Sequence, residues 1–221
     1  MKPLFLDWNL GLGDAIICNG LVRFLSNAEP RRKIVLPCWE RNFTTVRHMF
    51  SDLANVHVVA AQGDQAPVAH SRTYEILSIG LLNNQNWGRI AQWDEAFYRF
   101  ANVPFGAKWD MFHVPESGTE LPSRGATILV HEDCERDFEI DHKRLSLQAT
   151  SRIVPGAAPF LTDWRNVIRD AKEIHVIDSA PMHLIELLPT TGKLFYHKYA
   201  RAQSSRQHMD AVLRKEWTVL E

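Results

Sequence analysis

The sequence predicts an α/β protein made of two small Rossmann-like units, each a parallel sheet flanked by helices. Two observations support this fold class: a strand–glycine turn–helix pattern opens the chain, and a second strand–turn–helix pattern lies near its C-terminal end. A third is the stretch 116–125, whose Gly, Pro and polar residues are typical of a linker. We therefore expect an N-terminal unit over 1–118 and a C-terminal unit over 124–221.

The opening pattern is a short apolar run, a turn with two glycines, and a helix. Leu4–Leu6 form the run, Gly11 and Gly13 let the backbone turn sharply, and Asp14 suits the start of a helix. Apolar side chains then recur at helical spacing, at Ile16, Ile17, Leu21, Phe24 and Leu25. Such turns lie at the carboxyl edge of a parallel sheet, where ligands bind.

The remaining elements follow an alternating order of strands and helices. In the first half we expect strands over 33–36, 56–60 and 73–79, and helices over 39–50 and 92–101. In the second half we expect strands over 126–131, 152–155, 173–177 and 193–197, and helices over 163–170, 181–188 and 204–215. Strands that alternate with helices indicate parallel sheets with right-handed crossovers.

Composition excludes several function classes. The chain has 221 residues, 45% of them hydrophobic, and a formal net charge of −1. It therefore carries no global basic field that would hold nucleic acid or an anionic membrane. Asp7 and Asn9 interrupt the N-terminal apolar run, so we expect neither a signal peptide nor a membrane span. The cysteines are odd in number and widely spaced, which indicates reduced thiols in a cytoplasmic protein; they are Cys18, Cys38 and Cys134.

The common nucleotide-binding and hydrolase motifs are absent or incomplete in this sequence. Ile16 occupies the third glycine position of a dinucleotide fingerprint, and the second strand is not followed by an acid suited to a ribose. The glycine turn also lacks the Gly-Lys-Ser/Thr of a phosphate-binding P-loop. The chain contains no Gly-x-Ser-x-Gly elbow, so Ser-His-Asp hydrolysis is not supported.

Two stretches together resemble the heptosyltransferase-like (family 9) glycosyltransferases of GT-B fold. Gly11-Leu12-Gly13-Asp14 before an apolar helix resembles the family's N-terminal motif. Ile174–Leu188 resembles its donor-site motif, a strand, then Asp-Ser/Thr-Gly-Pro-Met-His, then a helix. The chain has Ala180 where the family usually has Gly, which narrows the backbone's freedom. With 221 residues, the protein would be an unusually short member of the family.

The resemblance implies transfer of a sugar from a nucleotide-sugar donor to a hydroxyl acceptor. It implies an inverting reaction without metal or other cofactor, with Asp14 as the base, and the two motifs on opposite walls of a cleft. Three classes of acceptor remain open: a glycan, a small molecule and a modified DNA base. The implied donor-binding residues are Asp178, Ser179, Ala180, Pro181, Met182, His183 and Glu186. Further candidates for phosphate or cleft contacts are Gly11, Gly13, His131, Arg136 and Lys198, with the pair Lys143-Arg144 nearby.

Each candidate also has a purely structural interpretation. Asp14 would then only cap its helix, Asp178-Ser179 would form an ordinary N-cap, and His183 would be a buried structural histidine. If 137–141 were a strand, Asp137, Glu139 and Asp141 would share one face and could together bind a metal. A solvated strand face explains the same pattern as well. Two other functions stay open: a non-catalytic GT-B-like module that binds nucleotide or glycan, and an unrelated α/β nucleotide-binding enzyme.

Overall fold

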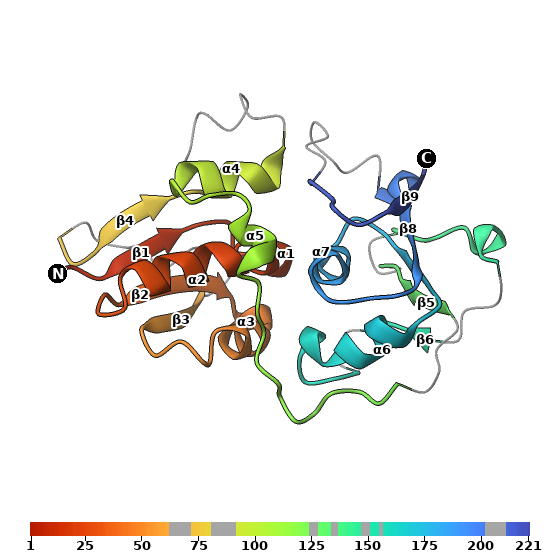
Figure 1. The fold of residues 1–221 in the computed structure, drawn as a ribbon, viewed down its shortest axis with the longest axis horizontal. Coiled ribbons are helices and arrows are strands. Elements are labelled where there is room, and N and C mark those ends of the chain that lie inside the picture. The colour runs from red at the N-terminus through yellow and green to blue at the C-terminus, as the bar shows by residue number, and fades with distance from the viewer. Residues whose placement is uncertain are drawn as a thin grey trace. The chain divides into compact units, whose positions relative to one another are not determined.

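The computed structural model describes residues 1–61, 72–80, 92–123, 128–133, 137–146, 151–154, 157–201 and 211–221. Residue contacts divide the chain into two compact units. The first comprises Met1–Pro115 and Met209–Val212, and the second comprises Glu116–His208 and Leu213–Glu221. Each unit holds one sheet with helices packed around it, and both sheets are parallel (Figure 1). The predicted α/β fold class is therefore confirmed.

The first sheet has the strand order β3-β2-β1-β4, with all strands parallel. Its strands are β1 (Leu4–Asp7), β2 (Ile34–Trp39), β3 (Val56–Ala61) and β4 (Glu75–Ser78). The chain runs from β1 outward to β3 and then returns to place β4 on the other side of β1. This reversal makes the carboxyl ends of β1 and β4 the topological switch point, which is where ligands bind in open α/β sheets.

The helices of the first unit are short and packed closely. They are α1 (Leu12–Ile17), α2 (Asn19–Ala28), α3 (Phe43–Met49), α4 (Trp93–Phe100) and α5 (Ala107–Asp110). The single helix expected after the glycine turn is thus split at Cys18 into α1 and α2. Gly20 allows α2 to lie directly on α5, since a Cβ at this position would stand 1.9 Å from the carbonyl oxygen of Ala107.

Strand β2 extends further than its sequence pattern indicates, through Pro37 to Trp39. Its ladder with β1 ends after Phe5 pairs with Val35, whereas its ladder with β3 continues to Trp39. Pro37 is tolerated because it lacks an N–H on a stretch that has already diverged from β1. The indole N–H of Trp8 donates to the carbonyl of Pro37 at 2.5 Å, which satisfies an acceptor that the ladder leaves open.

A buried ion pair in the first unit also forms hydrogen bonds with Val212, which lies in the C-terminal part of the chain. Lys108 Nζ lies 2.6 Å from Asp94 Oδ2, and the side chains are 1% and 0% exposed. Lys108 also donates to the carbonyl of Val212 at 2.9 Å, and the Val212 amide donates to Asp94 at 3.0 Å. Because removing one partner would leave an uncompensated buried charge, a break in this pair costs about 3–5 kcal/mol.

The second sheet has the order β6-β5-β7-β8-β9 and is also parallel throughout. Its strands are β5 (Ile128–His131), β6 (Ser151–Arg152), β7 (Glu173–Val176), β8 (Lys193–His197) and β9 (Trp217–Leu220). Helix α6 (Arg165–Asp170) precedes β7, and α7 (Ala180–Leu187) joins β7 to β8. Here the chain reverses direction at β5, so the switch point lies at the carboxyl ends of β5 and β7.

The C-terminal end of the chain differs from the sequence prediction. We expected a closing helix over 204–215, but 211–215 are not helical and 202–210 lie outside the described residues. Residues Trp217–Leu220 instead form β9, which pairs in parallel with β8. The run Trp-Thr-Val-Leu has the β-branched and aromatic side chains that suit a strand. Its four residues were too few to show an alternating pattern by themselves.

Two composition-based expectations concern thiols and membranes. Cys18 and Cys38 are free and buried, whereas Cys134 lies outside the described residues. Burial raises the pKa of Cys38 to about 11, and burial raises the pKa of Cys18 as well, so neither thiol forms a reactive thiolate at neutral pH. Among the described helices, none has the length and apolar character that crossing a membrane requires.

Candidate functional site

The first candidate region is the turn that follows β1. Gly11 is the N-cap residue of α1, with extended backbone angles, and as a glycine it offers no side-chain cap. Leu12, Gly13 and Asp14 form the first helical turn. Asp14 is therefore the third helical residue and does not hold the cap position. Its negative charge still lies in the first turn of a helix, where the backbone dipole stabilises it.

Gly11 makes room for the Asp14 carboxylate. A Cβ at Gly11 would stand 2.5 Å from Asp14 Oδ2, so any other residue would push this carboxylate away. The side-chain amide of Asn9 donates to Asp14 Oδ1 at 3.3 Å and also restrains the carboxylate. The glycine and the amide together fix one orientation of an acid at the switch point of the first sheet.

An aromatic side chain that was not among the residues predicted from the sequence lies next to this turn. Trp39 ends β2, and its backbone N–H donates to the carbonyl of Leu10 at 3.3 Å. The Arg41 guanidinium stacks over the Trp39 ring, 4.4 Å from its centre. The indole nitrogen of Trp39 is buried without a hydrogen-bond partner in the described part of the chain. The sequence signal was that Trp39 follows a predicted strand, as ligand-contacting residues often do.

The second candidate region is the turn between β7 and α7. Ser179 holds the N-cap position of α7, and Pro181 lies in its first turn. The Ser179 hydroxyl does not cap the helix, because it donates to the carbonyl of Ile177 at 3.1 Å. The Ser179 side chain therefore leaves the backbone N–H groups of Ala180 and Met182 uncapped at a helix N-terminus, an arrangement that suits an anion such as phosphate. Pro181 has no N–H to leave unsatisfied.

Arg201 brings a positive charge to this helix start. Its Nη1 donates to the carbonyl of Asp178 at 2.6 Å and lies 3.9 Å from Asp178 Oδ2. The guanidinium also lies over the ring of Phe138, 5.5 Å from its centre. Arg201 was not among the residues predicted from the sequence, whereas Lys198, on the same 3-10 turn Lys198–Arg201, was. Lys198 Nζ lies 3.7 Å from the carboxylate of Glu221 at the C-terminus.

The other residues of the donor-like motif are mostly buried. His183 is 3% exposed, and its Nε2 lies 3.8 Å from Asp178 Oδ1. Met182 is also 3% exposed. Glu186 is 2% exposed, and its carboxylate accepts hydrogen bonds from the amides of Arg214 and Lys215 and the indole of Trp217, at 2.8, 3.4 and 2.8 Å. Glu186 thus holds the segment that leads into β9.

The carboxyl end of β5 lies at the same switch point as the α7 turn. His131 ends this strand, is 9% exposed and has its Nδ1 3.4 Å from the carbonyl of Ile153. Glu132 comes next, and its side chain is 7% exposed. Arg136, a further candidate from the sequence, lies outside the described residues. We therefore place His131 at the edge of the candidate site and leave Arg136 as a prediction.

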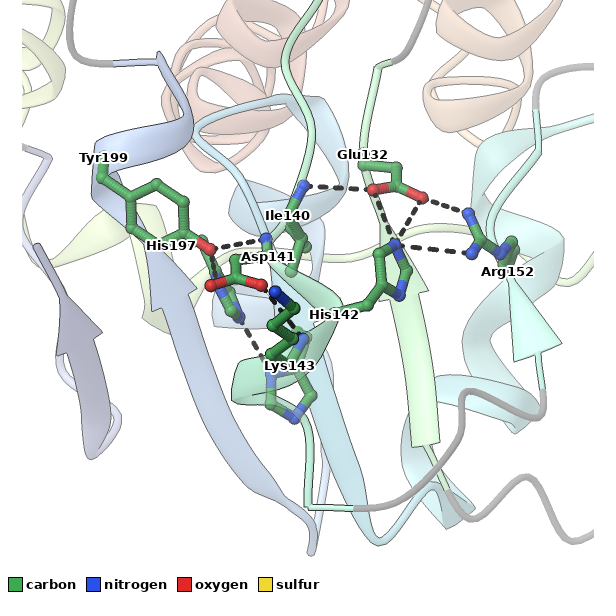
Figure 2. Close-up of polar contacts among 9 residues, drawn as sticks. Glu132, Ile140, Asp141, His142, Lys143, Arg152, His197 and Tyr199 are labelled. Carbon is green, nitrogen blue, oxygen red and sulfur yellow. Dashed lines mark hydrogen bonds and ion pairs between the residues drawn. The ribbon is translucent and has the colours of Figure 1, made fainter.

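Glu132 is the centre of a charged cluster, shown in Figure 2. His142 Nε2 lies 3.2 Å from both carboxylate oxygens, Arg152 Nη1 donates to Oε1, and the Ile140 amide donates to Oε2 at 3.1 Å. Burial alone would raise the pKa of Glu132. The hydrogen bonds from Ile140 and His142 and the nearby positive charges outweigh burial and lower it. Glu132 is therefore an anion that organises the residues around it.

The sequence left open a metal site at Asp137, Glu139 and Asp141. These residues do not form a strand face: Asp137 has a positive φ of 58° in a turn, and Asp141 is the N-cap of the 3-10 turn His142–Arg144. Within the described residues, no three His, Cys, Asp or Glu side chains gather closely enough to hold a metal ion.

Comparison with known proteins finds matches by structure. Neither a protein-family model nor a curated protein sequence matches the chain. TibC from enterotoxigenic E. coli H10407, an iron-containing dodecameric glycosyltransferase, matches with a TM-score of 0.56 at 9% identity, over 88% of this chain and 58% of TibC. A complex of the heptosyltransferase TibC with ADP-D-beta-D-heptose matches with a TM-score of 0.52 at 12% identity, over 87% and 58%. A family 9 glycosyl transferase from Veillonella parvula gives 0.48 at 10% identity, over 99% and 85%.

These similarities concern the fold. The chain spans 58% of the length of TibC, and its identity to both TibC structures is 12% or less. The chain therefore has the fold of heptosyltransferase-like glycosyltransferases, as the two sequence motifs predicted.

Proposed function

We propose that the protein is a glycosyltransferase that moves a sugar from a nucleoside diphosphate donor to a hydroxyl acceptor. The observation that carries this proposal is the start of α7, where backbone N–H groups without a side-chain cap lie beside the Arg201 guanidinium. This arrangement, which suits an anion, follows a strand at the switch point of the second parallel sheet. The fold is shared with TibC, a structure of which contains ADP-D-beta-D-heptose.

The donor half of the proposal concerns the charge of the diphosphate. When the bond to the sugar breaks, negative charge develops on the leaving phosphate, and fixed dipoles and cations lower the barrier by stabilising it. The amides of Ala180 and Met182 supply the dipoles. Arg201, from the 3-10 turn after β8, supplies a cation that bonds the carbonyl of Asp178 just before this helix. Lys143, in the 3-10 turn His142–Arg144, supplies a second cation. With these groups the reaction needs no metal ion.

The acceptor half concerns Asp14. In the proposal, its carboxylate takes the proton from the acceptor hydroxyl while the hydroxyl oxygen attacks the anomeric carbon. One displacement of this kind inverts the configuration at that carbon. The support is the fixed carboxylate, held over Gly11 and contacted by Asn9 at a sheet switch point. The acceptor is a hydroxyl compound whose class, whether glycan, small molecule or modified DNA base, is for experiment to identify.

Titration calorimetry with ADP, UDP and GDP tests the donor half. We expect one of the three to bind, with the same affinity in the presence of EDTA. Loss of binding on chelation would contradict the metal-independent proposal. If none of the three binds, the glycosyltransferase proposal fails at its first step. Consumption of the corresponding nucleotide sugar, followed as release of the nucleoside diphosphate, then tests for transfer or slow hydrolysis.

A further inference from the structure

A line of hydrogen bonds crosses the second sheet from Tyr199 to Glu173. The Tyr199 hydroxyl lies 2.9 Å from His197 Nδ1, and His197 Nε2 lies 2.9 Å from His175 Nδ1. His175 Nε2 in turn lies 3.5 Å from Glu173 Oε2. The two histidines are buried, at 1% and 0% exposed, and His175 also stacks on Phe195 with ring centres 4.4 Å apart. Figure 2 shows the Tyr199 end of this line.

The direction of every hydrogen bond in the line can be assigned. The hydrogen bond from Ser146 lowers the pKa of Glu173, which is therefore a carboxylate and can only accept, so His175 Nε2 carries a proton. Burial lowers the pKa of His175 and lowers that of His197 to about 4, so both rings are neutral at pH 7. His175 Nδ1 then accepts from His197 Nε2–H, and His197 Nδ1 accepts from the Tyr199 hydroxyl.

The Tyr199 oxygen therefore keeps a lone pair for one further partner. That partner is the backbone N–H of Asp141, at 2.8 Å. The preceding N–H, of Ile140, donates to Glu132 at 3.1 Å (Figure 2). Two consecutive amides are thus held by side chains that follow two different strands, β5 and β8.

These two anchors fix a turn that carries an available cation. The Asp141 carboxylate accepts the Lys143 amide at 3.1 Å and starts the 3-10 turn His142–Arg144. Arg144 stacks on Tyr199, 4.5 Å from its ring centre, and donates to the carbonyl of Glu221 at 3.1 Å. The ammonium group of exposed Lys143 has no hydrogen-bond or ion-pair partner among the described residues. The position of this turn therefore determines which groups the Lys143 ammonium can contact.

We propose that Tyr199 and Glu132 are positioning residues that hold the turn Asp141–Arg144 so that Lys143 meets the diphosphate of the donor. The one-way line through His197 and His175 to Glu173 orients the Tyr199 hydroxyl for this purpose. This inference rests on the proposed function, because it assigns the ligand of Lys143. Hydrogen bonds in such a line polarise one another, so loss of one member weakens the rest.

The first experiment tests the network without any ligand. In ¹⁵N spectra at pH 7, His175 and His197 are expected as neutral rings protonated on Nε2. In Tyr199→Phe, the Asp141 amide loses its acceptor and should exchange its hydrogen about tenfold faster or more, while the Ile140 amide is little changed. Tyr74→Phe is the matched control, because this ring packs on Phe5 and its hydroxyl has no partner among the described residues. A His197 ring protonated on Nδ1, or unchanged Asp141 exchange, would overturn the proposal.

The second experiment tests the consequence for binding, with whichever of ADP, UDP or GDP binds the wild-type protein. Lys143→Gln and Tyr199→Phe are each expected to weaken binding about tenfold, and Tyr74→Phe to leave it unchanged. The double variant Tyr199→Phe/Lys143→Gln should bind no more weakly than Lys143→Gln alone, because Tyr199 acts through Lys143. Additive losses would contradict the positioning role.

The two proposals fail in different ways. If the wild-type protein binds none of the three nucleotides, the proposed function fails, and so does the ligand assigned to Lys143. The tautomers of His175 and His197 and the exchange rate of the Asp141 amide then still decide whether Tyr199 holds the turn. If the wild-type protein binds and Tyr199→Phe binds equally well, the positioning role fails and the proposed function stands.

Discussion

The two strand–turn–helix regions of the molecule share a backbone plan and differ in charge. Each follows a strand at a sheet switch point and leads into a helix whose N-cap residue makes no side-chain cap hydrogen bond. After β1 the turn presents a carboxylate, Asp14, over a glycine. After β7 the turn presents amide groups beside a guanidinium, Arg201. The first arrangement suits a group that takes a proton, and the second suits a group that receives an anion.

The difference shows that the N-terminus of a helix does not by itself determine whether a turn presents a base or receives an anion. In the first turn the acid lies in the helix, where the dipole favours its negative charge. In the second turn the acid, Asp178, precedes the helix, and Arg201 bonds the Asp178 backbone and lies near its carboxylate. A cation near the second helix start lets the turn attract a further negative charge. The substitutions below test this division of roles.

The largest effect is expected for Asp14→Asn. The amide keeps the shape of the side chain but cannot take a proton from the acceptor, so turnover should fall by roughly 10²–10⁴-fold. Affinity for the nucleoside diphosphate should stay near wild type, because its proposed site is the start of α7. The melting temperature should change little, since a negative charge in the first helical turn contributes about 0.3–1 kcal/mol. Donor consumption and a melting curve measure the two quantities. Near-wild-type turnover would exclude Asp14 as the base and leave it a structural role.

Arg201→Gln tests the second turn. Loss of the charge should weaken nucleoside diphosphate binding by about 10–100-fold, the range expected when a charged hydrogen bond is lost. Turnover at saturating donor should fall less than in Asp14→Asn. Calorimetry gives the affinity directly. An affinity equal to that of the wild-type protein would remove Arg201 from the donor site.

Gly11→Ala tests the support of the Asp14 carboxylate with a smaller change. The new methyl group would approach Asp14 Oδ2 to 2.5 Å, so the carboxylate must rotate away and turnover should fall about tenfold. The fold should persist, because only a flexible side chain has to move. Gly20→Ala is the contrasting variant: its methyl group would meet a backbone oxygen at 1.9 Å and should lower the melting temperature strongly. Full activity in Gly11→Ala would show that the carboxylate position is unimportant.

The smallest effect is expected for Lys198→Gln, on the same 3-10 turn as Arg201. Lys198 pairs with exposed Glu221, and exposed pairs contribute about 0–1 kcal/mol to stability. Nucleoside diphosphate affinity should be unchanged, which makes this variant the matched control for Arg201→Gln. If Lys198→Gln weakens binding more than Arg201→Gln does, the cation of the donor site is Lys198, as the sequence first suggested.

Much of the fold could be predicted from local patterns. The buried strands β1 and β5 are mainly apolar runs, as is typical of parallel sheets. Helices α4 and α7 lie within the ranges where helical spacing predicted them, 92–101 and 181–188, to within one residue. The break at Cys18 and the extension of β2 through Pro37 could not be predicted, because both depend on packing against other segments. β9 depends on pairing with β8, which its four residues do not reveal alone.

In the candidate site, too, the residues that belong to local patterns could be predicted, and those that depend on long-range contacts could not. Asp14 and the Asp178–His183 turn were found because each follows a strand and begins a helix. Arg201 and Tyr199 were missed, since their importance comes from long-range contacts with Asp178 and Asp141 that no spacing encodes. The Ser179 hydroxyl resembled a cap in sequence, but its hydrogen bond to Ile177 leaves the helix start open.

The central claim is that a nucleoside diphosphate binds at the start of α7. Backbone amide spectra of the ¹⁵N-labelled protein, recorded during titration with ADP, UDP and GDP, test it most directly. The account predicts that one nucleotide shifts the amide signals of Ala180 and Met182, while those of Gly11 and Asp14 stay in place without an acceptor. Shifts confined to the Gly11–Asp14 turn, or no shift with any of the three, would contradict it.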